Sequence, residues 1–165
     1  MKRLTLVRHG KSSWKDADLA DFDRPLNKRG ERDAPRMGEC LYRRNLRPDL
    51  ILSSPAQRAR QTAEALVETL KLAPEQLRFD ASIYEAEPAD LLKLIRSFEE
   101  EWQHVLLVGH NPGLTELGNL LADCGLDNLP TCGVLVIDSD CSSWRQVAPR
   151  GGSLALFDSP KKPSL

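Results

Sequence analysis

The sequence of 165 residues has no apolar run long enough to cross a membrane as a helix. Its first residues, MKRLTLVRHG, include only a few apolar side chains before Arg8, too few for the core of a secretion signal. The net charge of −1 lacks the strong positive bias of proteins that bind nucleic acid or membrane surfaces in bulk. We therefore expect a cytoplasmic protein that binds neither nucleic acid nor membranes.

The chain also lacks the cysteine spacing of a zinc or redox motif. None of Cys40, Cys124, Cys132 and Cys141 forms a Cys-x-x-Cys pair. Their wide spacing and the missing secretion signal favour reduced structural thiols over a zinc site or a disulfide. No set of residues has the spacing of metal ligands, so we expect no metal and no other cofactor.

No internal repeat and no linker divides the chain. Its length fits one domain, and its hydrophobic fraction of 41% and charged fraction of 28% are typical of globular proteins. The last residues, SPKKPSL, are rich in proline and lysine. We predict a single domain over residues 1–158 and a flexible tail from Ser159 to Leu165.

Short apolar runs alternate with segments of helical periodicity. The runs predict strands at Leu4–Val7, at Leu50–Leu52, briefly before Tyr84, and at Val105–Val108, Val134–Ile137 and Leu154–Phe157. Helices are predicted from Lys28 to Arg44, from Pro55 to Leu70, from Pro88 to Trp102, and after Pro112. Pro35 should kink the first helix or delay its start.

This alternation indicates an α/β fold, a three-layer sandwich with a mostly parallel central sheet and helices on both faces. The last two strands are separated by little except a turn region at 139–143. They are therefore candidates for an antiparallel pair at one edge of the sheet.

Polar side chains gather where the predicted strands end. In order, the strands lead into Arg8-His9-Gly10, Ser53-Ser54-Pro55 with Arg58 in the next helical turn, Tyr84-Glu85, and Gly109-His110-Asn111. Ligands of such folds bind beyond the carboxyl ends of the strands. Each residue alone is more often an ordinary loop or surface residue, but their joint placement favours one shared site. The third histidine, His104, starts its strand and is expected to be structural.

Two predicted helix starts are suited to anions. Ser54 and Asn111 are natural N-caps, and each precedes a proline at the first helical position. Free backbone N–H groups at helix starts attract phosphate. Arg8 and Arg58 could each grip a phosphate through two donors. Arg58 shares a helix face with Thr62 whereas Arg60 points away, so we assign Arg58 to the site.

Four segments, RHGKSSW, DFDRPLNKRG, SSPAQRARQTAE and VGHNPGL, together resemble the histidine phosphatase superfamily, which has the phosphoglycerate-mutase-like fold. The resemblance runs from about Leu4 to Leu121 and is greatest to the SixA-type branch, the phosphohistidine phosphatases. It implies that His9 is the nucleophile and that Arg8, Arg58 and His110 complete a metal-free phosphate pocket. A neutral imidazole nitrogen is a good nucleophile, and nearby arginines keep it unprotonated.

Further roles follow from the same resemblance. Many relatives carry an asparagine shortly after Arg-His-Gly, where this chain has Lys15, and Ser12 is then a candidate phosphate donor, with Asn111 a second. Glu85 stands where relatives carry the general acid, and Glu87 is a less favoured substitute. For Asp21, Asp23 and Arg24 we favour an Asp–Arg pair that orders the loop before Asn27 over a role in the site.

The predicted activity is a metal-independent phosphatase. Its expected substrate is a signalling or phosphotransfer protein that carries phosphohistidine, because an imidazole leaves easily once protonated and needs no strong general acid. The alternative is a phosphomonoesterase for a small phosphorylated metabolite that uses the same His9 chemistry. A non-catalytic phosphate-binding module is a third and weaker interpretation, because both His9 and His110 are present.

Overall fold

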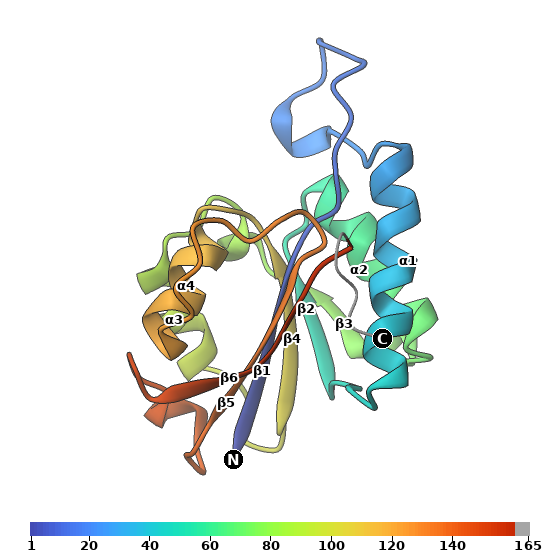
Figure 1. Cartoon of the computed structure of the whole chain (residues 1–165). Helices are drawn as coiled ribbons and strands as arrows, with labels where there is room; N and C mark the ends of the chain where they lie inside the picture. The colour runs from blue at the N-terminus through green and yellow to red at the C-terminus, as the bar shows by residue number, and fades with distance from the viewer. Residues whose placement is uncertain (161–165) are drawn as a thin grey trace.

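The computed structural model describes residues 1–160, which form one six-stranded sheet with helices on both faces (Figure 1). The strands are β1 (Lys2–Arg8), β2 (Leu50–Ser53), β3 (Leu77–Phe79), β4 (His104–Gly109), β5 (Val134–Ser139) and β6 (Gly152–Asp158). Their order across the sheet is β3-β2-β4-β1-β5-β6. The first four strands pair in parallel, and β5 runs antiparallel to both β1 and β6. The predicted α/β fold and its antiparallel final pair are confirmed.

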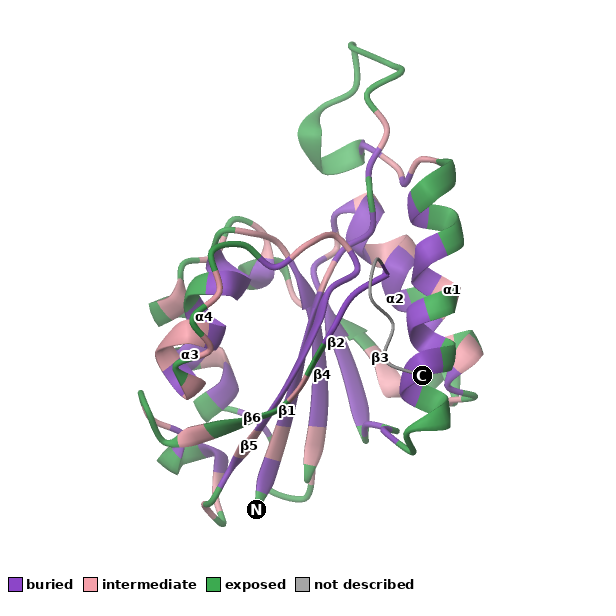
Figure 2. Ribbon diagram, viewed as in Figure 1, coloured by how far each residue is buried: buried purple, intermediate pink, exposed green. Residues whose placement is uncertain are grey.

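Four α-helices form the two outer layers. They are α1 (Lys28–Arg43), α2 (Gln57–Thr69), α3 (Pro88–Arg96) and α4 (Gly113–Ala122). Helices α1 and α2 pack together on one face of the sheet, and α3 and α4 pack together on the other (Figure 1). Because both faces are covered, the central strands are buried along nearly their whole length, as Figure 2 shows.

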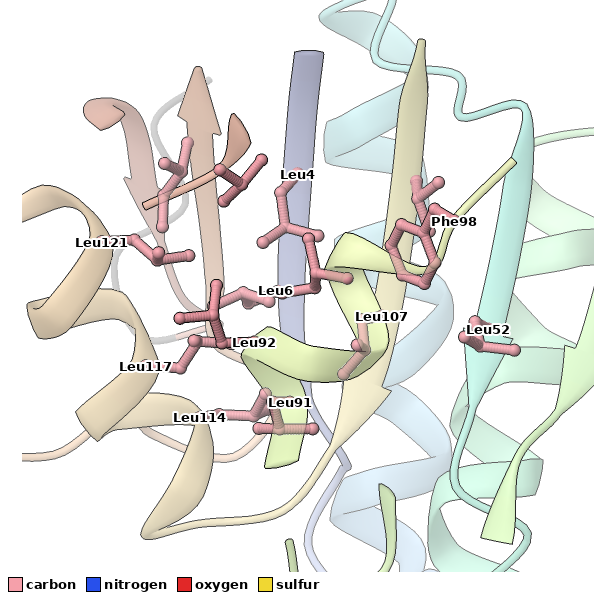
Figure 3. Close-up of a cluster of buried hydrophobic side chains, with 14 of the residues drawn as sticks. Leu4, Leu6, Leu52, Leu91, Leu92, Phe98, Leu107, Leu114, Leu117 and Leu121 are labelled. Atoms are coloured by element: carbon pink, nitrogen blue, oxygen red, sulfur yellow. The ribbon is translucent and has the colours of Figure 1, made fainter. Parts of the chain in front are cut away.

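Alternation along each strand divides the apolar side chains between two cores. In β1, Leu4 and Leu6 belong to the core beneath α3 and α4, which Figure 3 shows, and Val7 belongs to the core beneath α1 and α2. In β4, Leu107 and Val108 divide in the same way. This period of two is the ordinary geometry of a strand, and it fixes the register of the sheet.

Helix α1 is not delayed by Pro35, and a delay was one of the two effects that the sequence predicted for this proline. It begins at Lys28, where the Asn27 side chain accepts a hydrogen bond from Gly30 N–H (2.9 Å), and it continues past the proline to Arg43. Proline removes one backbone donor, and the buried side of the helix, which includes Met37 and Leu41, packs firmly enough to outweigh that loss.

Helix α3 ends at Arg96, earlier than the predicted Trp102. The next residues include Glu99, Glu100 and Glu101, and carboxylates at a helix C-terminus oppose the helix dipole. Phe98 still reaches the core, from irregular backbone rather than from the helix. The apolar spacing therefore correctly identified a buried side chain outside the helix.

At the carboxyl end of the chain, Ser159 and Pro160, the first two residues of the predicted tail, are buried. The rest of that tail, residues 161–165, lies outside the described residues. None of the helices described in residues 1–160 is long and apolar enough to span a membrane.

Candidate active site

The carboxyl ends of β1, β2 and β4 meet at one edge of the sheet. Arg8 pairs in register with Gly109, and Ser53 with Val108, so the residues that follow these strands lie side by side. The rings of His9 and His110 are 5.1 Å apart between centroids, at an angle of 52°. The two histidines that the sequence places after strand ends therefore lie close together.

A pocket of about 290 Å³ opens at this edge. The predicted site residues that line it are Arg8, His9, Ser12, Arg58, His110 and Asn111. The lining also includes Lys11, Trp14, Arg24 and Thr131, which were not assigned to the site. Of the described residues that line this pocket, several carry positive charge and none is Asp or Glu. The pocket is therefore suited to an anion.

His9 has one ring nitrogen fixed and the other free to react. Its Nδ1 lies 2.7 Å from the carbonyl oxygen of Gly10 and must donate to it, because a carbonyl only accepts. We assign the neutral tautomer in which Nε2 carries the lone pair. Nε2 accepts a long hydrogen bond, 3.4 Å, from Nε of Arg58. This is the arrangement that a nitrogen nucleophile requires.

The surroundings of His9 keep its ring uncharged. Burial lowers the pKa of His9 from its ordinary value of 6.5 to about 3. The positive charges of Arg58 and Arg8 act in the same direction, and the hydrogen bond to Gly10 opposes them. An unprotonated imidazole is thus the dominant form at neutral pH, and only this form can attack phosphorus.

The backbone after His9 is tied to α2. The Gly10 N–H donates to Oγ1 of Thr62 at 3.0 Å, and the same hydroxyl donates to the carbonyl of Arg58 at 2.8 Å. Arg58 and Thr62 lie one turn apart on the buried face of α2, whereas Arg60 packs its guanidinium over the ring of Phe79, 4.0 Å from the centroid. The shared face therefore delivers Arg58 to His9.

Arg58 is held from its outer side by Asp21. Its Nη1 donates to the Asp21 carbonyl at 2.7 Å and its Nη2 donates to the Asp21 carboxylate at 3.0 Å. With both terminal nitrogens engaged, Nε faces His9. The Arg58 side chain is only 8% exposed, so this ion pair is shielded from water on the arginine side.

The Asp21 carboxylate also accepts hydrogen bonds from Arg24 (2.9 Å) and from the Tyr84 hydroxyl (2.6 Å). The hydrogen bond from Tyr84, followed by those from Arg58, holds the pKa of Asp21 below its ordinary value. The same contact raises the pKa of Tyr84 to about 12. Asp21 thus remains charged and Tyr84 remains protonated. Asp21 pairs with Arg24 as the sequence suggested and, in addition, contacts a residue of the pocket.

His110 is oriented by Ser54, whose hydroxyl lies 2.7 Å from Nε2. The Ser54 oxygen accepts from the Ala56 N–H (3.2 Å), so its own proton is free to be donated to His110. This assignment puts the ring proton on Nδ1. Burial, helped by the positive charge of Arg58, lowers the pKa of His110 to about 4. The second histidine is therefore also neutral near pH 7.

Two buried polar atoms in this pocket wall have no hydrogen-bond partner in the described part of the chain. They are Nε of Arg8 and Nδ1 of His110. Arg8 donates from Nη1 to the Leu129 carbonyl (3.0 Å), and burial lowers its pKa. Unsatisfied buried donors are rare and costly, and a bound anion beside them would supply acceptors.

Ser12 and Asn111 differ in what they can offer an anion. The Ser12 oxygen accepts a hydrogen bond from Arg24, so its own proton can still be donated. Asn111 already donates both amide hydrogens, to Asn128 Oδ1 (2.9 Å) and to the Leu129 carbonyl (2.8 Å). Asn111 therefore lines the pocket without a spare side-chain donor, and its predicted part in phosphate binding stays a prediction.

Helix α2 starts two residues later than predicted, whereas α4 starts directly after Pro112 as predicted, with Pro112 rather than Asn111 at its N-cap position. Helix α2 begins at Gln57, because Ser54 caps the Ala56 N–H and pairs with His110 rather than starting the helix. Helix α4 begins at Gly113, after Pro112. The Asn111 side chain still accepts a hydrogen bond from the Thr115 N–H, in the first turn of this helix.

Glu85 lies beside the pocket rather than in it. Strand β3 ends at Phe79, and the short 3₁₀ turn Ala81–Ile83 separates it from Tyr84 and Glu85. Glu85 is exposed and lines an adjoining pocket of about 480 Å³ that also contains Glu87. The two pockets share His110 and Asn111 in their walls.

Several other expectations concern residues away from this site. His104 pairs its Nε2 with Oγ1 of Thr5 at 2.7 Å, at the opposite end of β4 from His110. All four cysteines are free thiols, as predicted. Across residues 1–160 no three side chains of the metal-binding kinds are grouped closely enough to hold an ion.

Comparison with known proteins gives consistent matches. The model of the histidine phosphatase superfamily (branch 1) matches residues 4–112. The uncharacterized chloroplastic protein At3g52155 of Arabidopsis thaliana is 31% identical over 92% of this chain and 72% of its own length. The uncharacterized protein Rv1276c of Mycobacterium tuberculosis is 33% identical over 94% of this chain and 100% of its own length.

Among solved structures, the one assigned as a SixA phosphohistidine phosphatase from Agrobacterium tumefaciens is 32% identical. It superposes with a TM-score of 0.83 over 96% of this chain and 98% of that chain. The predicted phosphoglycerate-mutase-like fold is confirmed by this likeness. The chain belongs to the histidine phosphatase superfamily.

Proposed function

We propose that this protein removes the phosphoryl group from phosphohistidine on other proteins, through a covalent phosphohistidine on His9 and without a metal ion. The observation that carries the proposal is the geometry of His9. Its Nδ1 is held by Gly10 while its unprotonated Nε2 is presented beside Arg58. Membership of the histidine phosphatase superfamily and the likeness to a structure assigned as SixA support the same chemistry.

The first step is the transfer of the phosphoryl group to His9. Nε2 attacks phosphorus, the new N–P bond forms, and the N–P bond to the substrate histidine breaks. When the other nitrogen of the substrate ring carries a proton, the leaving group is a neutral imidazole. His9 keeps its proton on Nδ1, where the Gly10 carbonyl stabilises the positive charge that develops on the ring.

The second step is hydrolysis of the phosphorylated His9. A water oxygen attacks phosphorus, the P–Nε2 bond breaks, and both water protons leave on dihydrogen phosphate. In the transition state of each step, negative charge lies on the three equatorial oxygens of the phosphoryl group. Arg8 and Arg58 stabilise that charge from the pocket wall, with Ser12 as a further donor.

The pocket favours a P–N bond over an alkyl phosphoester. An alkoxide leaves poorly and needs a general acid, whereas imidazole is a good leaving group. The described lining of the pocket has no carboxyl group, and Glu85 lies exposed in the adjoining pocket. The volume of about 290 Å³ is at the low end for sites that enclose a whole small molecule. A phosphoryl group presented on a protein surface suits such a pocket better.

A substrate panel tests this proposal. Free phosphohistidine, a phosphohistidine peptide, an alkyl phosphoester and an aryl phosphoester are each supplied, with a metal chelator present throughout. We expect the phosphohistidine substrates to have the highest kcat/KM. Faster cleavage of the alkyl phosphoester would favour the metabolite phosphatase, activity that requires an added divalent ion would overturn the metal-free mechanism, and phosphate binding without any turnover would indicate a non-catalytic module.

A further inference from the structure

The segment between Lys11 and Asn27 projects beyond the rest of the molecule as an extended loop (Figure 1). It is exposed along much of its length (Figure 2). Three large apolar side chains on it face solvent, namely Trp14 (73% exposed), Leu19 (39%) and Phe22 (38%). Trp14 is the most exposed of the three, and a large exposed apolar side chain beside a pocket often marks a contact with another molecule. We call these three residues the loop patch.

Trp14 is exposed but its ring is held in place. The Arg24 guanidinium lies over the ring, 3.4 Å from its centroid, and Arg24 is itself buried. Arg24 donates to the Ser12 hydroxyl, to the Ser13 carbonyl at 3.2 Å and to Asp21 at 2.9 Å. An aromatic ring fixed in this way loses little conformational freedom when a partner binds, which favours its use as an interface anchor.

The base of the loop is fixed to the pocket as well. Asp21 contacts Arg58 and Tyr84, and the Phe22 ring meets the Tyr84 ring edge-on with centroids 5.2 Å apart. Trp14 also forms part of the wall of the pocket that contains His9. Trp14 and Phe22 are therefore held at set positions relative to the nucleophile.

We propose that the loop patch is the docking surface for the protein that carries the phosphohistidine, with Trp14 as its central contact. This inference rests on the proposed function. The pocket that contains His9 opens to solvent at the edge of the sheet, and Trp14 is an exposed part of its wall, so a protein whose phosphoryl group reaches His9 must pass close to Trp14. Because the patch is apolar, the complementary surface beside the phosphohistidine is expected to be apolar too.

Two synthetic peptides test the proposal. Both carry a central phosphohistidine, which is flanked by leucines in one and by serines in the other, and free phosphohistidine is the third substrate. For the wild-type protein we expect kcat/KM to be about tenfold higher for the leucine peptide than for the serine peptide. In Trp14→Ala this preference should disappear. In Leu19→Ala, outside the pocket, the preference should fall while hydrolysis of free phosphohistidine is unchanged.

A matched control is Tyr42→Ala, which removes an aromatic side chain of α1 that is 40% exposed and does not line the pocket. It should leave the preference intact. Equal turnover of the two peptides by the wild-type protein, or a preference that survives in Trp14→Ala, would overturn the docking proposal and leave the proposed function standing. If the wild-type protein cleaves phosphoesters but none of the three phosphohistidine substrates, the proposed function and the docking proposal both fail.

Discussion

Nε of Arg58 donates a hydrogen bond of 3.4 Å to Nε2 of His9, the nitrogen that we assign as nucleophile. This contact has two consequences. It requires the lone pair to lie on Nε2, because the guanidinium can only donate. It also places a positive charge next to the nitrogen that attacks phosphorus. When a phosphoryl group arrives, its oxygens can replace His9 as hydrogen-bond acceptors for Arg58.

Replacing Asp21 tests whether turnover depends on the hydrogen bonds by which Asp21 positions Arg58. Asp21→Asn keeps the shape but weakens the charged hydrogen bonds from Arg58 and Arg24. We expect kcat to fall about ten- to a hundredfold, with a smaller change in KM, the range for loss of a charged hydrogen bond. Steady-state kinetics measures both. Asp23→Asn is the control, because Asp23 is an exposed residue of the same short 3₁₀ turn, Asp21–Asp23. Equal losses in both variants would contradict the role of Asp21.

The buried histidines predict how stability depends on pH. The folded protein holds the pKa of His9 at about 3 and those of His104 and His110 at about 4, against an ordinary value of 6.5. Below pH 6.5 the unfolded chain therefore binds more protons than the folded one. The free energy of unfolding should decrease as the pH is lowered from about 6.5 towards 4, before most carboxylates titrate.

Urea unfolding at pH 7 and at pH 5 measures this decrease. His104→Gln removes one of the three titrating rings without touching the candidate active site, so the difference between the two pH values should become smaller. Unfolding free energies that do not change between these pH values would show that the histidines are not held neutral in the folded state.

Whether turnover needs Glu85 as a general acid depends on the leaving group of the substrate. Because Glu85 is exposed and lines the adjoining pocket, Glu85→Gln should change phosphohistidine turnover by no more than about twofold, whereas a general acid would contribute a hundredfold or more. An alkyl phosphoester assayed in parallel reports any residual acid role. A large loss on phosphohistidine would mean that Glu85 takes part in the site after all.

Much of the site was predictable because it follows from local patterns and one rule of topology. Arg8 is the last residue of β1, His9 and His110 come directly after buried strands, and parallel strands bring their carboxyl ends together. Arg58 could be separated from Arg60 by helical periodicity alone, and the structure places only Arg58 in the pocket. These predictions needed no knowledge of distant contacts.

The parts that the sequence did not predict depend on contacts between distant segments. Asp21 and Arg58 are 37 residues apart, and no sequence periodicity links a residue of an irregular loop to a residue of a distant helix. Trp14 and Arg24 both lie in an irregular loop, whose path is set by hydrogen bonds rather than by an apolar repeat. Glu85 lies farther along the chain from the end of β3 than the sequence suggested, because a 3₁₀ turn separates them.

The central claim is that His9 carries the phosphoryl group during turnover. Rapid acid-free quenching of the protein with a phosphohistidine substrate, followed by peptide mass spectrometry, should find an acid-labile phosphoryl group on His9. His9→Ala should show no such label and should lose turnover by about 10⁴-fold or more, as expected for a nucleophile. A phosphoryl group on another residue, or label and turnover that persist in His9→Ala, would contradict the account.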